Sequence, residues 1–304
     1  MIAFLCRRVL QAVAVLLLVT LIVFTLLQLG PGAARTDAVG AGAAHSQFLA
    51  QYLTWLGHVA VGNLGVSARG GQAVSTLLAT SLPRTLVLAG ISTVLALAVA
   101  IPIGLVQAVR RGTTVDHVLR GLSFVFFGMP PFVLGTVLIL FLGVSAHMFG
   151  AEGPQAAGVG GMITDWRDLT LPVLTLALGT VAIFARYMRS SAVDSLEEEY
   201  VDAARARGAG QRRVLMRHVL RNSLVPIVTL VGLSVPQILG GALIVESVFN
   251  IQGVGYQMWQ AALTRDLPVI LGFTLIMGIG AVLGSLLADV GYALIDPRVR
   301  FSRT

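Results

Sequence analysis

The stretch EYVDAARARGAGQRRVLMRHVL, residues 199–220 (the charged loop), decides how the rest of the chain is interpreted. It holds two acidic residues and five arginines, and it interrupts a sequence that is 56% hydrophobic and only 12% charged. Soluble domains are typically about half apolar, with about a quarter of their residues charged. A compact block of charge in so apolar a chain therefore indicates a loop in water between segments that lie in a membrane.

Apolar segments long enough to cross a bilayer lie on both sides of the charged loop. The mean hydropathy of the chain is +0.86, and a bilayer core requires about 20 apolar residues per helix. Six stretches without a charged residue approach or meet this length: 9–29, 85–109, 121–144, 169–185, 224–245 and 267–288. The first exceeds the 7–15 apolar residues of a cleaved signal peptide, so we expect it to remain as a helix.

The positions of the arginines predict the orientation of the chain. All 21 basic residues are arginine, and the net charge is +7. With a cytoplasmic N-terminus, 16 arginines lie inside and five outside, as the positive-inside rule favours. Both termini are then cytoplasmic. Because the arginines flank apolar runs, we interpret them as topology signals and not as a nucleic-acid surface. The single cysteine, Cys6, excludes an internal disulfide framework.

Two segments predicted to lie outside have structure of their own. In residues 47–65, Phe48, Tyr52, Trp55 and Leu56 recur near helical spacing, which predicts a short helix at the outer interface. Residues 246–266 are too polar to span and too apolar to lie free in water. We expect this second segment to dip back into protein as a gate or partner-contact element. The residues that we expect to dip back are Phe249, Val254, Tyr256, Met258 and Trp259. Ordinary packing is the alternative for both segments.

The charged loop is predicted to form two short helices with a glycine corner. Acidic residues precede arginines in its first half, which complements a helix dipole, and Gly208 permits a turn. Arg213, Arg217 and Arg221 then form one basic row at i, i+4 spacing. Ala203 and Ala204 are small enough to let a partner approach closely, so we expect a helix that docks in a groove. The alternative is a basic loop that contacts anionic lipid headgroups.

The charged loop resembles the Glu-Ala-Ala loop of ABC-importer permeases. Asp202, Ala203, Ala204 and Gly208 match that pattern, with aspartate in place of glutamate, whereas His218 and Arg221 stand where the pattern has isoleucine and proline. Further stretches are similar to dipeptide and oligopeptide permeases. They are RRVLQAVAVLLLVTLIVFTLLQLGPG near the start, YLTWLGHVAVGNLG, VESVFNIQGVGY and DVGYALIDPRVR. The resemblance therefore covers nearly the whole chain.

The resemblance implies an all-α polytopic membrane protein with six transmembrane helices and the type I ABC importer (MetI-like) permease fold. It divides the chain into an N-terminal helix (1–30), an extracytoplasmic segment (31–82), a permease core (83–295) with its loop at 195–221, and a cytoplasmic tail (296–304). It places the protein in the inner (cytoplasmic) membrane as a non-catalytic subunit. The implied activity is ATP-driven import of short peptides.

The resemblance also implies partners. They are a second homologous permease, two ATP-binding subunits, an extracytoplasmic substrate-binding protein and membrane lipid, with no nucleic acid. ATP and Mg²⁺ would be held by the ATP-binding subunits, and this chain would hold no cofactor or metal. The implied ATPase-coupling residues are Asp202, Ala203, Ala204, Gly208, Arg212 and Arg213. Phe249, Tyr256 and Trp259 would form the outer gate or the contact with the binding protein.

The residues themselves point to a translocation path and leave some alternatives open. We expect Pro130 and Pro131 to interrupt the third apolar stretch, and Pro226 and Pro236 the fifth. Proline in a membrane helix frees carbonyl groups that protein, water or substrate must satisfy, so we place the path at Pro130, Pro131, Pro236 and Gln237. Kinks without substrate contact are the alternative. The sequence has no nucleotide-binding glycine loop. A nickel or glutathione permease and, with less support, an ion-coupled secondary transporter remain alternative functions.

Overall fold

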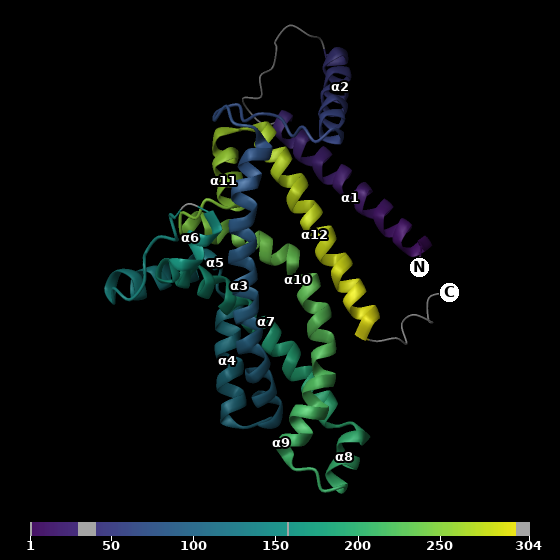
Figure 1. Cartoon of the computed structure of the whole chain (residues 1–304), viewed down its shortest axis with the longest axis vertical. Helices are drawn as coiled ribbons and strands as arrows, with labels where there is room; N and C mark the ends of the chain where they lie inside the picture. The colour runs from purple at the N-terminus through teal and green to yellow at the C-terminus, as the bar shows by residue number, and fades with distance from the viewer. Residues whose placement is uncertain (1, 30–40, 157, 296–304) are drawn as a thin grey trace.

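The computed structural model describes the backbone of residues 2–29, 41–156 and 158–295, and the side chains of residues 10–26, 49–156, 158–240 and 242–286. Figure 1 shows that this part of the chain is built of helices joined by short connections. In order they are α1 (Ile2–Leu29), α2 (Ala41–Ala60), α3 (Val74–Val109), α4 (Thr114–Gly128), α5 (Pro131–Leu138), η1 (Ile139–Ser145), α6 (Gly158–Thr164), α7 (Trp166–Leu196), α8 (Glu199–Ala206), α9 (Gln211–Val214), η2 (Leu215–Val219), α10 (Leu220–Val248), α11 (Val254–Thr264) and α12 (Leu267–Ile295). The prediction of an all-α chain is confirmed.

The long helices follow from the bilayer environment that the apolar segments require. Inside a bilayer every backbone N–H and C=O must be satisfied within the segment, and a helix does this. The 36 residues of α3 extend about 54 Å at 1.5 Å per residue, well beyond the roughly 30 Å of a hydrocarbon core. This helix begins 11 residues before the predicted start at Thr85, because the helical pattern continues into more polar residues.

The number of spans differs from the prediction. In the part of the chain that the structure describes, four helices are long and apolar enough to cross a membrane. They are Val74–Val109, Trp166–Leu196, Gln211–Val248 and Leu267–Leu286. The count reaches five if a bent helix pair forms one span. The first predicted span corresponds to α1, whose described apolar part is the shorter stretch Leu10–Leu26. Six spans are therefore not confirmed, whereas a multi-pass membrane protein is.

The third predicted span is broken at its two prolines. Helix α4 ends at Gly128, α5 begins at Pro131, and the two halves bend by 106°. Pro130 has an extended backbone with ψ 141°, because the ring of the following proline disfavours the helical conformation in the residue before it. The prediction that Pro130 and Pro131 interrupt this segment is confirmed.

The prolines of the fifth predicted span have the opposite outcome. Pro226 and Pro236 lie inside α10, which continues past both of them. The expectation that they interrupt the span is wrong, because a membrane helix tolerates proline when neighbouring groups re-satisfy the freed carbonyls.

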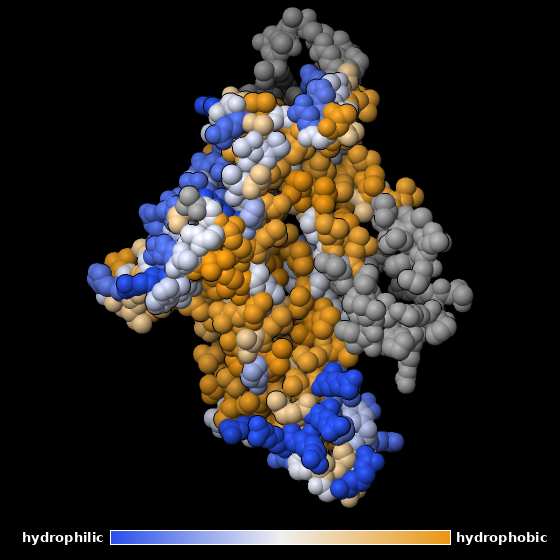
Figure 2. All heavy atoms as spheres, viewed as in Figure 1, coloured by the Kyte–Doolittle hydropathy of each residue, from blue (hydrophilic) through white to orange (hydrophobic). Residues whose placement is uncertain are grey.

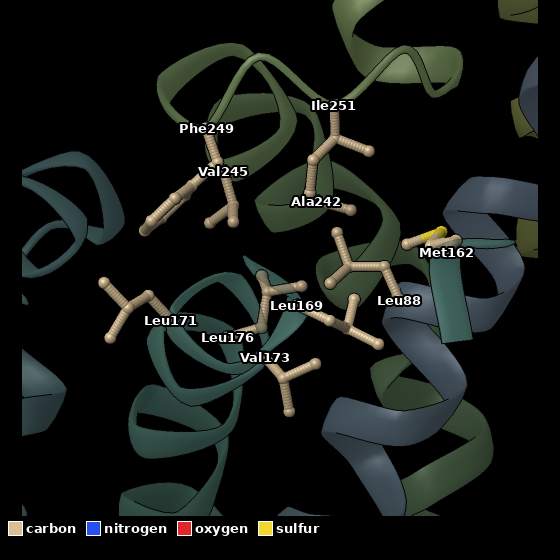
Figure 3. Close-up of a cluster of buried hydrophobic side chains, with 10 residues drawn as sticks. All are labelled: Leu88, Met162, Leu169, Leu171, Val173, Leu176, Ala242, Val245, Phe249 and Ile251. Atoms are coloured by element: carbon tan, nitrogen blue, oxygen red, sulfur yellow. The ribbon is translucent and has the colours of Figure 1, made fainter. Parts of the chain in front are cut away.

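Helix α7 is the central element of the fold, since it packs against α3, α4, α5 and α10. Figure 3 shows one apolar core at its N-terminal end. Leu88 of α3, Met162 of α6, and Leu169, Leu171, Val173 and Leu176 of α7 meet Ala242, Val245, Phe249 and Ile251. Because these side chains come from four helices and the turn after α10, the cluster joins most of the helical core.

Helix α2 confirms the helix predicted around Tyr52 and Trp55. Tyr52 is buried against α1, where its hydroxyl lies 2.9 Å from the Thr20 hydroxyl and its ring packs on Phe24 with a centroid separation of 5.5 Å. Phe48, which shares this helical spacing, lies outside the described side chains. Helix α2 is thus held to α1 by an aromatic cluster.

The surface is polar at the two ends and apolar between them. Figure 2 shows hydrophilic residues gathered at the lower end, over α8 and α9, and again towards the end with α2 and α11. The hydrophobic surface between these ends is what a bilayer would cover.

Candidate coupling surface and transport path

The charged loop has the predicted helix–corner–helix form. Helix α8 ends at Ala206, Gly208 has a left-handed backbone with φ +81°, and α9 begins at Gln211. The Gly208 N–H donates to the Arg205 carbonyl at 2.9 Å. A Cβ at this position would meet no atom within 4 Å. Glycine is therefore favoured here by the backbone conformation and not by lack of space.

The loop folds back on the ends of the long helices instead of projecting alone. Val201, Ala204, Val214 and Val219 are buried with Met188 and neighbouring side chains in one apolar cluster. Val214 and Val219 thus lie away from the exposed basic row. Ala204 corrects the prediction, because it is 3% exposed and packs inside the protein. A small residue in a short amphipathic helix fits its own core as well as it fits a partner.

The opposite face of the loop is open to solvent. Its exposed members include four of the predicted coupling residues, Asp202, Ala203, Arg212 and Arg213. A surface hollow of about 890 Å³ lies over α9, lined by Gly210, Gln211, Arg212, Arg213, Met216 and Arg217. Sequence reasoning missed the exposed Met216, which gives this basic face an apolar contact. The loop therefore presents a mixed apolar and basic surface.

An ion pair with a buried carboxylate ties α7, the helix that enters the loop, to α4. The Asp116 carboxylate is fully buried and accepts from Arg189 Nε at 2.9 Å and Arg189 Nη2 at 3.0 Å. The Gly112 N–H also donates to it at 3.0 Å, and Arg120 Nε lies 3.4 Å away. Such bidentate geometry is the strong form of an arginine–carboxylate pair. Helices α4 and α7 are thereby held in one relative position.

Sequence reasoning missed this pair because its members are 73 residues apart. The only local signal is Asp116 itself, an acid in the first turn of a helix with Arg120 at i+4. A second pair, Arg111–Glu197 at 2.7 Å, joins the α3–α4 turn to the end of α7, but both of its side chains are exposed. Exposed ion pairs contribute little to stability, so the contacts of Asp116 are the main polar connection between α4 and α7.

The translocation residues are only partly brought together. A cavity of about 180 Å³ lies between α3, α4, α5, α7 and α10 (the central cavity), and its lining residues include Pro131 and Gln237. Pro130 and Pro236 do not line it. The cavity wall instead contains hydroxyl side chains from α3, α7 and α10, which the sequence pattern did not single out because serine and threonine are ordinary in membrane helices.

At the opposite end of the molecule, Glu246 organises the start of α11. Its carboxylate is fully buried and accepts from the Thr85 hydroxyl at 2.6 Å, from Gly255 N at 2.7 Å and from Tyr256 N at 3.2 Å. A Cβ at Gly253 would overlap this carboxylate. The glutamate thus caps a helix N-terminus, where negative charge is favoured, and joins α10, α3 and α11.

The three predicted gate residues have different environments. Phe249 is fully buried in the core of Figure 3, so the expectation that it dips back into protein is confirmed, whereas its role in a gate or binding-protein contact stays a prediction. Trp259 on α11 is 49% exposed, so the expectation that it dips into the protein is wrong. Tyr256 is half-buried. Leucine-rich packing at the end of α10 draws Phe249 inward, whereas the amphipathic α11 turns Trp259 outward.

Comparison with known proteins identifies the family. Residues 100–301 match the protein family described as binding-protein-dependent transport system inner membrane component. The chain is 36% identical to the oligopeptide transport system permease protein AppB of Bacillus subtilis, over 99% of this chain and all of the relative. It is 30% identical to the dipeptide transport system permease protein DppB of Escherichia coli over the full length of both. The chain belongs to the family of binding-protein-dependent transport system inner membrane components.

Solved structures agree with this family at the level of the fold. A MetNI methionine ABC transporter in an inward-facing conformation has a chain that superposes with a TM-score of 0.59, at 16% identity, over 73% of this chain and 97% of the other. An amino acid ABC transporter gives a TM-score of 0.51 at 18% identity, over 72% and 94%. The family match includes the charged loop and every residue of the central cavity wall from Phe126 onwards.

Proposed function

We propose that the chain is the membrane permease subunit of an ATP-driven importer that moves short peptides into the cell across the cytoplasmic membrane. Family membership supports the transport role. The peptide cargo is supported by relatives named as oligopeptide and dipeptide permeases, which this chain covers over nearly their whole length. The subunit itself is non-catalytic in this proposal.

The partners follow from the family and from the exposed face of the charged loop. A second permease completes the membrane unit, an extracytoplasmic protein delivers the peptide, and two ATP-binding subunits hold ATP and Mg²⁺. The basic hollow over α9, with Met216 among its lining residues, is the proposed contact with one ATP-binding subunit. Asp202, Ala203, Arg212 and Arg213 belong to this contact, and Gly208 shapes it. Ala204 supports it from inside.

The continuity of two helices is the observation that carries the coupling mechanism. Helix α7 enters the charged loop and α10 leaves it, and both line the central cavity. From Leu196 to Thr180 is about 24 Å along α7, and from Leu220 to Ser234 about 21 Å along α10, at 1.5 Å per residue. Displacement of the loop therefore moves two cavity walls directly.

The loop moves as a unit because it is fastened to the core. The apolar cluster around Val201 and Val214 and the buried Asp116–Arg189 pair join α8, α9, α4 and α7. When ATP draws the ATP-binding subunits together, the loop would follow them and the helices would rock between two arrangements. ATP can drive this change only if the subunits contact the loop differently in the two states.

The proposed sidedness is testable by reporter fusions. We expect fusions after Ser46 and after Gly160 to lie outside the cell and a fusion after Gly208 to lie inside. The physical reason is the distribution of arginines across the membrane. A cytoplasmic signal at Gly160 would contradict the topology.

The proposed cargo is testable in cells. Cells without this protein should resist toxic short peptides that need such uptake, and should regain sensitivity when the gene is restored. Unchanged peptide uptake together with lost nickel or glutathione uptake would overturn the peptide assignment. Transport that continues without any ATP-binding subunit would instead indicate a secondary transporter.

A further inference from the structure

The central cavity has a chemical character that the proposed function does not by itself supply. Its polar lining residues are all uncharged: Ser92 and Thr93 from α3, Thr175 and Thr180 from α7, and Ser234 and Gln237 from α10. No Asp, Glu, Arg or His belongs to the described lining. The cavity volume of about 180 Å³ is several times the roughly 30 Å³ of one water molecule. A piece of a peptide fits such a space, whereas a complete peptide does not.

Four of the hydroxyl groups already donate their protons to backbone carbonyl groups. Thr93 donates to the Ala89 carbonyl at 2.7 Å, and Thr175 donates to the Leu171 carbonyl at 2.8 Å. Thr180 donates to the Leu176 carbonyl at 2.9 Å. Ser234 likewise donates to its own helix, at the Leu230 carbonyl, at 2.6 Å. A hydroxyl has one proton and two acceptor lone pairs, so what these groups retain towards the cavity is acceptor capacity.

Ser92 gives the second, independent indication of a ligand. It lines the same cavity and is only 2% exposed, and its hydroxyl has no hydrogen-bond partner among the described residues. Buried polar groups in folded proteins are nearly always paired. Its neighbour Thr93 bonds back to its own helix, whereas Ser92 remains available. A group that binds cargo transiently has this property.

We infer that the central cavity is a subsite for N–H groups of the transported peptide, recognised by the hydroxyl oxygens of Thr180, Ser234 and their neighbours. This inference rests on the proposed peptide-import function. Backbone N–H groups and the amino terminus are common to all short peptides. The neutral acceptors in the wall can bind them whatever side chains the peptide carries. The subsite thus recognises the peptide backbone and does not discriminate between side chains.

The test uses the complete importer, with its partner subunits, in proteoliposomes. The cargo is trialanine, and the comparison cargo is trialanine methylated at the amide nitrogen of its middle residue, which removes one N–H. A second comparison cargo, acetylated at its amino terminus, separates the terminal ammonium from the backbone N–H. The variants are Thr180→Val and Ser234→Ala, with Thr180→Ser as the conservative replacement. Thr80→Val is the matched control, since Thr80 is an exposed residue of α3 that bonds back to its own helix.

The expected result is a loss of discrimination as well as a loss of affinity. Removing one acceptor should raise the apparent KM for trialanine about three- to tenfold, the range for one net hydrogen bond. The wild type should prefer trialanine over one of the two modified peptides, and Thr180→Val or Ser234→Ala should reduce that preference. If the loss caused by the variant and the loss caused by the modified peptide are not additive, the hydroxyl and the altered peptide group are in direct contact. Thr180→Ser should restore the preference, and Thr80→Val should keep it.

Each contrary outcome has a distinct meaning. If both variants impair all three peptides equally, the hydroxyl groups have a structural role and the inference is overturned. The same conclusion follows if the wild type does not distinguish the three peptides, although peptide import itself then stands. If the wild type transports nickel ions and no peptide, the proposed function falls, and the subsite falls with it because nickel has no N–H to donate.

Discussion

A valine in place of Gly208 tests whether the charged loop works through its shape. The corner has φ +81°, and a side chain there would meet no atom of this chain within 4 Å. The cost within the chain is therefore conformational, about 1–2 kcal/mol for a residue with a Cβ, and a β-branched residue is less suited still. That cost lowers the population of the native corner by about 5–30-fold where the loop is free to rearrange.

Asparagine at the same position provides the matched control. Asn adopts the left-handed conformation more readily than valine, so Gly208→Asn should retain more function than Gly208→Val. We expect Gly208→Val to leave the membrane complex assembled, and to lower substrate-stimulated ATP hydrolysis and transport about fivefold or more. The assay is hydrolysis with and without the loaded binding protein, on complexes purified through the permease.

Three results would refute this reasoning in different ways. Full stimulated hydrolysis in Gly208→Val would show that the corner is not needed for coupling. Equal losses in the asparagine and valine variants would show that contact, and not backbone conformation, is limiting. If replacing Arg213 and Arg217 by glutamine harms coupling more than either change at Gly208, the loop acts through its charge, as contact with lipid headgroups requires.

Three further substitutions test the contacts that hold the helices together. Ala204→Trp should now destabilise the loop itself by about 1–3 kcal/mol through overpacking, seen as protease cleavage within residues 199–220; an intact loop would contradict its burial. Asp116→Ala should cost about 1.5–3 kcal/mol through lost charge-assisted hydrogen bonds, and lower the melting temperature far more than Asp202→Ala, which removes an exposed pair; equal melting temperatures would contradict this. Glu246→Ala should leave two N–H groups of α11 without their acceptor, at about 1–3 kcal/mol each, and speed hydrogen exchange at residues 255 and 256; unchanged exchange would count against the cap.

The features that sequence alone predicted are those with a local physical cause. Gly208 predicted the corner because a left-handed backbone strongly favours glycine. Pro130 and Pro131 predicted the break between α4 and α5 because a proline restricts the residue before it. The bend of 106° was not predictable, since it depends on what α5 packs against.

The features that sequence alone missed depend on contacts between distant residues. Glu246 and Thr85 are 161 residues apart, and no periodic pattern connects them. Ala204 was misassigned because a small residue suits an internal core and a partner surface equally well. The cavity hydroxyls escaped notice for a similar reason. Nothing in the sequence around a serine on one helix indicates that two other helices bring their own polar groups to it.

The course of α7 and α10 divides the permease into parts that are exchangeable and parts that are not. Both helices pass from the charged loop into the cavity wall, whereas α3, α4 and α5 complete that wall without entering the loop. A chimera that takes α3 to α5 from a relative keeps its own charged loop, while two of its five cavity hydroxyl residues, Ser92 and Thr93, are replaced. Under the proposed function, selection on cargo can act freely on the part of the wall that α3 to α5 supply, whereas changes in α7 and α10 must also preserve the contact of the charged loop with the ATP-binding subunits.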